Sequence, residues 1–262
     1  MKKNVALALG SGGARGLAHI GVIEELEKNG FNITSVSGCS IGSLIGGFYA
    51  MNKLQEFSDW ICTLKKMDVY SLMDITLSQS GLLKGEKVFN KMKEMIPDIL
   101  IEDMNIPYTA VATDIINRSE VIFSNGSFYK AARASIAIPA IITPVEAKHG
   151  IIVDGGLLNP IPVNVVSRSG DDLLVAVNLY DYCRESRNAD DQIAEYNLGE
   201  DKNTESGSVG STSTIDYLHR KIKDIIPKGD KQSQSYFSLL QLTTSVMLSR
   251  ISYLSLQVNK PD

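Results

Sequence analysis

Cysteine is scarce in this sequence of 262 residues, and histidine is equally rare, with three of each. Cys39, Cys62 and Cys183 are odd in number and lie far apart, without the spacing of metal ligands. This pattern argues against a disulfide framework and is typical of a reducing compartment. We therefore expect a cytoplasmic protein that holds no metal ion.

Long apolar runs are also missing. The first residues, Met1-Lys2-Lys3, have the charge of a signal-peptide start, but the apolar run Val5–Leu9 is too short for the core of one. No stretch approaches the ~20 apolar residues that are needed to cross a bilayer. The sequence therefore predicts neither a leader nor a membrane-spanning helix.

A strong charge of either sign is absent, because the formal net charge is -4 at pH 7. Nothing electrostatic indicates a nucleic-acid partner. With 44% hydrophobic and 21% charged residues, the composition is that of an ordinary globular chain, long enough for one large core. We expect a single domain over residues 1–262.

The first functional candidate is Ser40, in the stretch Gly38-Cys39-Ser40-Ile41-Gly42. A β-like run, Ile33–Ser37, ends at Gly38, and a helical stretch of small residues begins after Ser40. Glycine two residues before and two residues after a serine is the nucleophile-elbow pattern. Such a turn strains the serine, leaves no room for side chains at Gly38 and Gly42, and exposes the hydroxyl at the positive end of a helix. An ordinary β–α turn rich in small residues has the same short pattern, so the motif alone leaves both interpretations open.

A glycine-rich loop, Gly10–Gly16, separates an apolar run at 4–9 from an amphipathic helix at 17–29. In dinucleotide-binding folds such a loop holds a pyrophosphate. That fold also needs an acidic residue at the end of its second strand, where this sequence has Ser35–Gly38. In addition, Arg15 stands where the last glycine of Gly-x-Gly-x-x-Gly would fall. A nucleotide-binding oxidoreductase is therefore the weaker interpretation.

The same loop geometry suits an oxyanion hole, in which adjacent amide N–H groups point at a developing alkoxide. Gly12, Gly13 and Ala14 are the candidate donors, and Arg15 would brace the loop or add positive potential. If the first two strands are parallel neighbours, both loops leave the same edge of the sheet. The amides then lie next to Ser40.

The remaining chain alternates apolar strands with amphipathic helices, which indicates the α/β class. Further strands are expected at 108–113, 119–123, 141–145, 150–154 and 173–179, and helices at 41–51, 54–64, 88–96, 127–135 and from Asn159 onward. The stretch from about 184 to 213 is rich in Glu, Asp, Asn, Ser, Gly and Thr, which predicts a mobile insertion without chemistry.

A C-terminal helical segment is expected from about 215 to 258. Its apolar residues fall on one stripe: Phe237, Leu240, Met247, Ile251, Leu254 and Val258. We expect this stripe to dock on the rest of the chain or to pair with a second subunit. Contact with lipid is the remaining alternative.

A serine hydroxyl needs a base to become a nucleophile, and histidine is the usual one. His19 follows the glycine loop and is expected to be a packing residue, whereas His149 lies beside a turn. His219 follows the mobile insertion, in a basic helix start. A triad of Ser40, Asp154 and His219 is formally allowed, but it would anchor a catalytic group beside that insertion.

Asp154 is the better candidate for a partner of the serine. It ends a strand in Asp154-Gly155-Gly156, where glycine permits the close approach of another loop. A turn-capping aspartate is the alternative interpretation, since such residues are common in these loops.

Three elements in this order resemble the bacterial patatin-like phospholipases, which are related in fold to plant patatin and cytosolic phospholipases. They are the loop Ser11–Gly16, the elbow Gly38–Gly42 and Asp154-Gly155-Gly156. The similarity spans roughly residues 4 to 180 and includes Arg15–Val22, Ala134–Pro139 and Asp154–Pro162. One departure is Ser11, where the family usually has the first glycine of its loop.

The resemblance implies a three-layer α/β/α sandwich, patatin-like, around a mostly parallel central sheet. It also implies a Ser–Asp dyad without a catalytic histidine, with Ser40 as nucleophile and Asp154 as general base. The amides of Gly12 and Gly13, with Arg15, would form the oxyanion site. A carboxylate with an ordinary pKa near 3.9 is a weak base, so it must lie within hydrogen-bond reach and be desolvated.

The activity implied is that of a lipid acyl hydrolase, a phospholipase, lysophospholipase or esterase, working through an acyl-enzyme without a cofactor. Its partner is a lipid or ester substrate, and transient contact with a membrane surface and homo-oligomerisation are left open. A catalytically silent lipid-binding or regulatory protein on the same fold is the alternative, and intact Ser40 and Asp154 argue against it. Relatives tend to continue past a Pro-Asp such as Pro261-Asp262 into a further strand, so we expect this chain to be shortened.

Overall fold

The computed structural model describes residues 3–78, 81–180 and 231–262. By their contacts the residues divide into two units, Met1–Tyr180 with Gln241–Asp262, and Asp181–Leu240. The insertion expected at 184–213 lies outside the described residues, and so does the first part of the helical segment expected at 215–258. The single domain over the whole chain stays a prediction.

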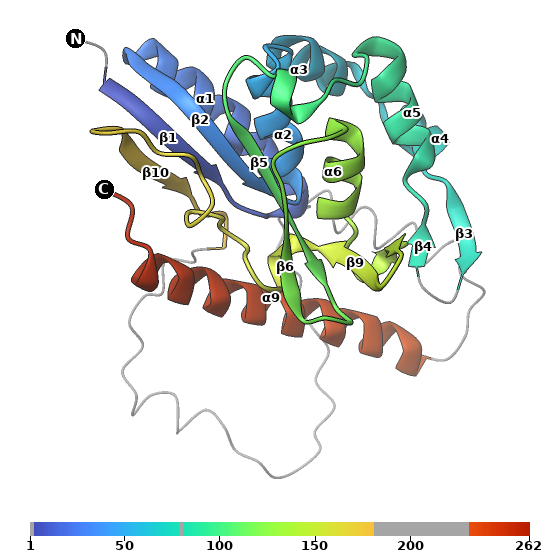
Figure 1. Ribbon diagram of the computed structural model, residues 1–262. Helices are drawn as coiled ribbons and strands as arrows, with labels where there is room; N and C mark the ends of the chain where they lie inside the picture. Colours follow the sequence, from blue (N-terminus) through green and yellow to red (C-terminus); the bar gives the residue numbers. More distant parts are fainter. Residues whose placement is uncertain (1–2, 79–80, 181–230) are drawn as a thin grey trace, which may run out of the picture. The chain divides into compact units, whose positions relative to one another are not determined.

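The main sheet is built from the apolar runs of the sequence. Within the described residues its strands are β1 (Lys3–Leu9), β2 (Phe31–Cys39), β5 (Tyr108–Asp114), β6 (Ser119–Phe123), β8 (Val145–Ala147), β9 (Gly150–Asp154) and β10 (Leu173–Val177). Their order is β10-β1-β2-β5-β9-β8, with β6 paired to β5 (Figure 1). The strands β10, β1, β2 and β5 run parallel, whereas β6, β9 and β8 join antiparallel. This confirms the predicted α/β class with a mostly parallel central sheet.

The other elements described are α1 (Ala18–Lys28), α2 (Ile41–Ala50), α3 (Leu54–Thr63), α4 (Lys66–Leu72), α5 (Glu86–Met95), α6 (Phe128–Ser135) and α9 (Lys231–Val258), with the 3-10 turns η1 (Gly13–Leu17), η2 (Ile101–Asp103) and η3 (Gly155–Leu157). A small second sheet has the order β3 (Ile75–Ser78), β4 (Gly81–Leu83) and β7 (Ala140–Ile142). The stretch 141–145, expected as one strand, is divided between β7 and β8. None of the helices in the described ranges is long and apolar enough to pass through a bilayer.

The alternation of side chains along β1 decides what covers each face of the sheet. Its larger side chains enter one core: Val5, Leu7 and Leu9. That core includes Phe48 of α2. On the opposite face the small Ala6 and Ala8 pack with Ile161 and, from α9, Leu256. Helices therefore cover both faces, with residues 241–258 of α9 on the other side of the sheet from α1 and α2 (Figure 1), and the predicted three-layer arrangement is confirmed.

An aromatic cluster joins α2, α3 and α6. Phe48 stacks on Phe57 with ring centroids 4.5 Å apart and meets Phe128 edge to face at 5.4 Å. The hydroxyl of Tyr129 donates to the carbonyl of Ile96 at 2.8 Å, which satisfies its polar end. Each aromatic pair contributes ~0.5–1.5 kcal/mol beyond the area it buries. The cluster therefore fixes α2, the helix that begins directly after Ser40.

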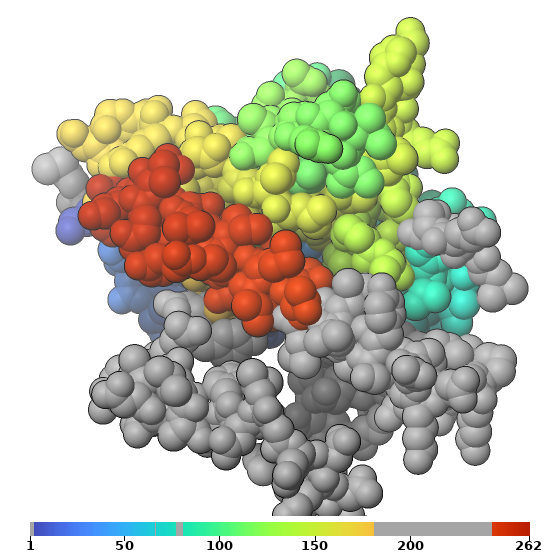
Figure 2. Space-filling view, turned by 90° about the horizontal axis from the view of Figure 1, so that it is seen from below, coloured from blue at the N-terminus to red at the C-terminus, as the bar shows by residue number. Residues whose placement is uncertain are grey.

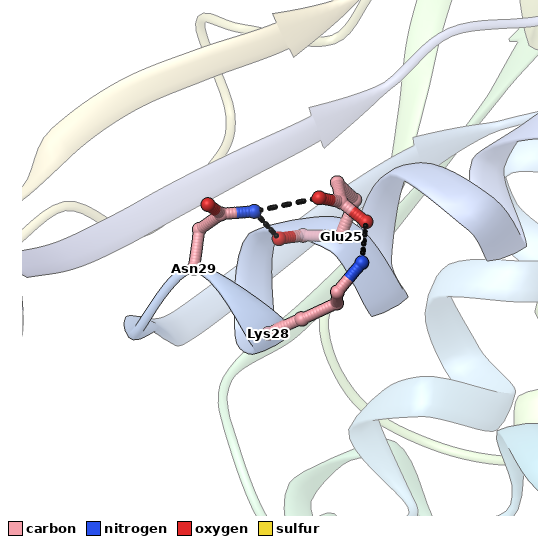
Figure 3. A network of polar contacts seen from close by, with 3 residues as sticks. All are labelled: Glu25, Lys28 and Asn29. Carbon is pink, nitrogen blue, oxygen red and sulfur yellow. Dashed lines mark hydrogen bonds and ion pairs between the residues drawn. The ribbon is translucent and has the colours of Figure 1, made fainter.

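The end of α1 is closed by its own side chains (Figure 3). Asn29 Nδ2 donates to the carbonyl oxygen and to Oε1 of Glu25, both at 2.8 Å, and Lys28 Nζ lies 3.1 Å from Glu25 Oε2. Gly30 follows with a φ of 78°, the left-handed conformation that commonly ends helices. These exposed contacts add little stability, but they fix where the chain turns into β2.

The segment after η3 differs from the prediction, because the chain forms turns where a helix was expected from Asn159. The carbonyl of Pro160 accepts the Ser11 N–H at 2.8 Å, and the carbonyl of Pro162 accepts the Ser37 hydroxyl at 2.7 Å. These bonds hold the segment to distant parts of the chain, and Pro162 itself has no N–H to donate to a helix. The helix prediction is wrong here, and the segment instead ties down the loop after β1 and the strand β2.

Candidate active site

Strand β5 brings together two residues that lie 114 positions apart in the sequence. Strand β2 runs parallel to β5, with Cys39 opposite Val111. Strand β9 pairs antiparallel with the same edge of β5 as β2 does, with Asp154 opposite Ala112. The other edge of β5 is occupied by β6. The carboxyl ends of β2 and β9 therefore meet head to head.

The turn after β2 holds Ser40 in a strained conformation. Its φ of 54° and ψ of -125° lie outside the regions that non-glycine residues favour. A Cβ atom at Gly38 would collide with the carbonyl oxygen of Gly42, and one at Gly42 would collide with the carbonyl oxygen of Leu9. Only glycine fits at either position, so the two residues let α2 begin in contact with β1 and β2.

The hydroxyl of Ser40 donates to the carboxylate of Asp154, with 2.5 Å between Oγ and Oδ2. The other carboxylate oxygen accepts the N–H of Gly156 at 2.8 Å. Ser40 is 4% exposed and Asp154 5%, so the hydroxyl that the sequence predicted to be exposed is buried. Burial raises the pKa of Asp154 from 3.8 to about 6, against the lowering effect of these two hydrogen bonds. The carboxylate is therefore a stronger base than an ordinary aspartate and still ionised at neutral pH.

Ser135, at the end of α6, holds the backbone of the elbow. Its Oγ accepts the Ser40 N–H at 2.8 Å and donates to the carbonyl of Val111 at 2.6 Å. Because a hydroxyl has one proton, the bond to Val111 orients the lone pair that receives the amide. Our sequence analysis did not assign Ser135 a role, although it lies in the stretch Ala134–Pro139 that carried the family resemblance.

The glycine loop is anchored to neighbouring segments just before its two central glycines. The amides of Gly10 and Ser11 donate to the carbonyls of Val177 and Pro160, at 3.0 and 2.8 Å. Within the loop the Arg15 N–H donates to the Gly12 carbonyl at 3.3 Å, which closes the turn that contains Gly13. A side chain at Gly16 would collide with Ile41, the residue after Ser40. The loop and the elbow are therefore in direct contact.

Tyr180 lies against the loop and was not singled out in the sequence. The guanidinium carbon of Arg15 is 5.0 Å from the centre of its ring, within the range of a cation–π contact. Burial raises the pKa of Tyr180 to about 12, so the phenol keeps its proton at neutral pH. From α9, Ser249 Oγ donates to the Tyr180 carbonyl at 3.2 Å. Tyr180 thus links Arg15 to the C-terminal helix.

The histidines lie elsewhere. His19 is buried, and its Nε2 lies 2.7 Å from the carbonyl oxygen of Gly10, which can only accept a proton, so Nε2 carries one. Burial lowers the pKa of His19, which favours the neutral ring. His149 is exposed, and His219 lies outside the described residues. Of the two imidazoles that the structure describes, neither is the partner of the Ser40 hydroxyl, which bonds to Asp154.

Metal-binding side chains do not gather in the described ranges, where no three His, Cys, Asp or Glu residues are grouped to hold an ion. The thiol of Cys39 lies beside the dyad, with its Sγ 4.0 Å from Asp154 Oδ1. Burial, followed by the charge of Asp154, raises the pKa of this thiol, so it stays neutral beside the carboxylate.

A serine on a strained strand-to-helix turn, bonded to an aspartate that ends a neighbouring strand, places the chain among α/β proteins with a nucleophile elbow. Residues 7–167 match the family model of patatin-like phospholipases. The chain belongs to the patatin-like phospholipase family, which confirms the resemblance seen in the sequence.

Several relatives are similar over the same region. An uncharacterised NTE family protein of Mycobacterium tuberculosis is 43% identical over 175 residues, which are 67% of this chain and 49% of the relative. Patatin-like phospholipase domain-containing protein 6 of Mus musculus is 31% identical over 182 residues, 67% of this chain and 13% of the relative. Among solved structures, VipD from Legionella pneumophila aligns with a TM-score of 0.48 and 16% identity, over 66% of this chain and 49% of VipD. The chain thus spans about half the length of the mycobacterial relative and a smaller part of the mouse protein.

Proposed function

We propose that the protein is a lipid acyl hydrolase in which Ser40 is the nucleophile and Asp154 the general base. The observation that carries this proposal is the 2.5 Å hydrogen bond between Ser40 Oγ and Asp154 Oδ2, formed on a strained elbow. Family membership supports the lipid ester as the class of substrate. Phospholipid, lysophospholipid and simple ester substrates are all compatible with this chemistry.

In the first half of the reaction, Asp154 Oδ2 takes the proton of the Ser40 hydroxyl as Oγ bonds to the ester carbonyl carbon. The carbonyl oxygen becomes an oxyanion, which the amides of Gly12 and Gly13 stabilise, with positive potential from Arg15. The intermediate then expels the alcohol, which leaves with the proton from Asp154, and the acyl group stays on Ser40. One good oxyanion donor is typically worth ~100- to 1,000-fold in rate.

In the second half, water replaces the alcohol. Asp154 takes a proton from the water as its oxygen bonds to the acyl carbon, and the same amides receive the second oxyanion. The bond to Ser40 Oγ then breaks, the serine recovers its proton from Asp154, and a fatty acid leaves. The raised pKa of Asp154 suits both steps, because the group must accept a proton and return it in every cycle.

Two variants test the proposal in the purified protein. Ser40→Ala and Asp154→Asn should each lower ester hydrolysis by at least ~1,000-fold while the protein stays folded by circular dichroism. Ser37→Ala is the matched control, because Ser37 is a buried serine on β2 whose hydroxyl bonds to the carbonyl of Pro162 rather than to Asp154. It should keep its activity.

A fluorophosphonate probe separates an enzyme from a silent lipid-binding protein on the same fold. The activated hydroxyl of Ser40 should attack the phosphorus and displace fluoride, which leaves a stable adduct that mass spectrometry assigns to Ser40. An unlabelled wild-type protein, or full hydrolysis by pure Ser40→Ala protein, would contradict the proposed function.

A further inference from the structure

Helix α9 presents apolar side chains to solvent as well as to the body. Its described side chains that are buried or half-buried are four serines and three aliphatic residues: Ser245, Ser249, Ser252, Ser255, Leu248, Ile251 and Leu256. Five further apolar residues lie among the exposed side chains, with Thr243, Thr244, Arg250 and Gln257 beside them. In an ordinary surface helix the apolar face packs on the core and the polar face meets water. The outward face of α9 therefore exposes apolar side chains that such a helix would bury.

The outward face is defined by Val246, Met247, Tyr253, Leu254 and Val258, which recur at spacings of seven and four residues along the described part of the helix. Val246 is 69% exposed, Met247 58% and Leu254 47%. Of the stripe that was expected to dock on the body or on a second subunit, Met247, Leu254 and Val258 are exposed and Ile251 is half-buried, whereas the side chains of Phe237 and Leu240 lie outside those described. Figure 2 shows this part of α9 in red, lying open on its face of the molecule.

The charges beside the outward face are positive. Between residues 241 and 261 the sequence has Arg250 and Lys260 but no Asp or Glu, although the whole chain has a net charge of -4. The guanidinium carbon of Arg250 lies 5.2 Å from the centre of the Tyr253 ring, so a cation and an amphipathic ring share the rim of this face. Asp262, which follows, is paired with Arg168. The combination of aromatic, aliphatic and basic side chains is typical of helices that lie in the head-group region of a membrane.

The inward face of the same helix lies on the candidate active site. A Cβ atom at Gly156 would be 3.2 Å from Leu248 Cδ2 and 3.1 Å from Asp154 Oδ1. Gly156 also donates its N–H to Asp154. Only the thickness of α9 therefore separates the exposed apolar face from the neighbourhood of the dyad.

We propose that the outward face of α9 binds the surface of a lipid bilayer and holds the protein against it beside the active site. This inference rests on the proposed function for its purpose, since a lipid hydrolase must reach acyl esters that are packed in a bilayer. The helix lies on the surface rather than crossing it, because none of the described helices is long and apolar enough to span. The basic residues favour anionic head groups.

A second copy of the chain fits this face less well. In a symmetric pair the two faces would meet each other, and Arg250 of each helix would approach a surface that carries no carboxylate between 241 and 261. A bilayer with anionic lipids supplies both the apolar layer and the negative charge.

Vesicle binding tests the inference in the full-length Ser40→Ala protein, whose inactivity keeps the lipid intact. The vesicles are phosphatidylcholine with roughly a third phosphatidylglycerol, and the bound fraction is measured by flotation. The parent protein should float with the vesicles, and Met247→Glu should lower its partition coefficient by about tenfold or more. Met67→Glu on α4 is the matched control, because Met67 is also an exposed methionine, at 74%, and should leave binding unchanged.

Fluorescence gives a second readout. Trp60 is the only tryptophan in the sequence, so Met247→Trp combined with Trp60→Phe reports on the outward face alone. Its emission should shift to the blue when vesicles are added. No shift, equal binding by Met247→Glu, or a Met247-dependent dimer in sedimentation without vesicle binding would each overturn the inference, and the last would assign the face to a second copy.

Hydrolysis of a short, water-soluble ester separates this inference from the proposed function. Met247→Glu with Ser40 intact should hydrolyse the soluble ester at the parent rate but lose about tenfold on vesicle phospholipid. Vesicle binding in a protein that hydrolyses no ester would remove the proposed function and leave the docking face. Hydrolysis of vesicle phospholipid at the parent rate by Met247→Glu would remove the docking face and leave the proposed function.

Discussion

Cys39 and Asp154 occupy consecutive positions along one edge of strand β5, opposite Val111 and Ala112. Because β2 and β9 arrive from opposite directions, the residue that follows Cys39 lies next to the last residue of β9. The contact between Ser40 and Asp154 is therefore held by two backbone ladders on a single strand. Such a frame positions the pair more firmly than loops could.

The pH dependence of kcat/KM should report the ionisation of Asp154. Burial raises the pKa of this carboxyl to about 6, and only the ionised form can take the proton of Ser40. We expect kcat/KM for a soluble ester to reach a plateau above about pH 7 and to fall about tenfold by about pH 5. Initial rates across this range measure the inflection.

His19 is a second buried titratable group among the described residues, and burial lowers its pKa from the ordinary 6.5. His19→Gln keeps an N–H that can donate to the carbonyl of Gly10 but removes the ionisation. The inflection near pH 6 should persist in this variant. Its disappearance would assign the ionisation to His19 instead of Asp154.

Asp154→Asn should make the protein more stable at alkaline pH. The folded-state pKa of about 6 lies above the ordinary value of 3.8, so folding opposes ionisation of this group. The free energy of unfolding that this ionisation removes is zero below pH 3.8 and grows as the pH rises toward 6. Above pH 6 it reaches its full value. The asparagine variant should therefore gain up to about 3 kcal/mol in the free energy of unfolding at about pH 8, and almost nothing at about pH 4. Urea unfolding at both pH values measures this.

Asp172→Asn is the control of opposite sign. The hydrogen bond from Thr34, at 2.7 Å, lowers the pKa of Asp172 below its ordinary value. Folding therefore favours the charged form of Asp172. The contribution of this charge to the free energy of unfolding is present at neutral pH and is lost as the pH falls through the lowered pKa. This variant should be destabilised at about pH 8. A gain in stability by both variants would contradict the assignment for Asp154.

Ser135→Ala should impair turnover more than its effect on stability explains. The variant leaves the Ser40 N–H and the Val111 carbonyl buried without their shared hydroxyl, which costs about 1–3 kcal/mol in the free energy of unfolding. Because Ser40 loses the bond that fixes its strained backbone, we expect kcat to fall about 10- to 100-fold with little change in KM. Steady-state kinetics and thermal melts provide the two measurements.

Ser37→Ala is the matched control for Ser135→Ala, since it also removes a buried serine hydroxyl from a bond to a carbonyl. It should lose comparable stability and keep kcat. Equal losses of kcat in the two variants would show that Ser135 acts only through stability.

Gly42→Ala should strongly destabilise the fold, because its methyl group would overlap the carbonyl of Leu9 in β1. Backbone atoms cannot move aside without breaking the β1–β2 pairing, so we expect a loss of more than about 3 kcal/mol in the free energy of unfolding. Gly21→Ala is the comparison: Gly21 lies in α1 with open space around its Cα. That substitution should stabilise the protein by about 0.5–1 kcal/mol, because alanine favours the helix. Denaturant unfolding of both variants gives the difference, and a tolerated Gly42→Ala would show that the elbow is not close-packed.

The sequence pattern was sufficient to predict structure where the interactions that decide it are between residues close in sequence. The apolar run at 4–9 became β1, and the glycines around Ser40 marked a turn whose steric demands involve residues close in sequence. Pattern failed at Asn159–Pro162, where the carbonyls are taken by Ser11 and Ser37 from distant segments. It also gave no role to Ser135, since one serine in a small-residue helix has no periodicity to reveal it.

The sequence by itself determined the α/β class, the strained turn at Ser40 and the candidate residues, because strand and helix periodicities and glycine sterics are properties of neighbouring residues. Tertiary structure decided which groups meet. Strand β5 aligns Ser40 with Asp154, burial raises the pKa of that carboxyl, and the packing of α9 leaves Met247, Leu254 and Val258 of its apolar stripe exposed. Each of these depends on desolvation or on contacts between segments far apart in the chain, whose free energies exist only once the chain has folded.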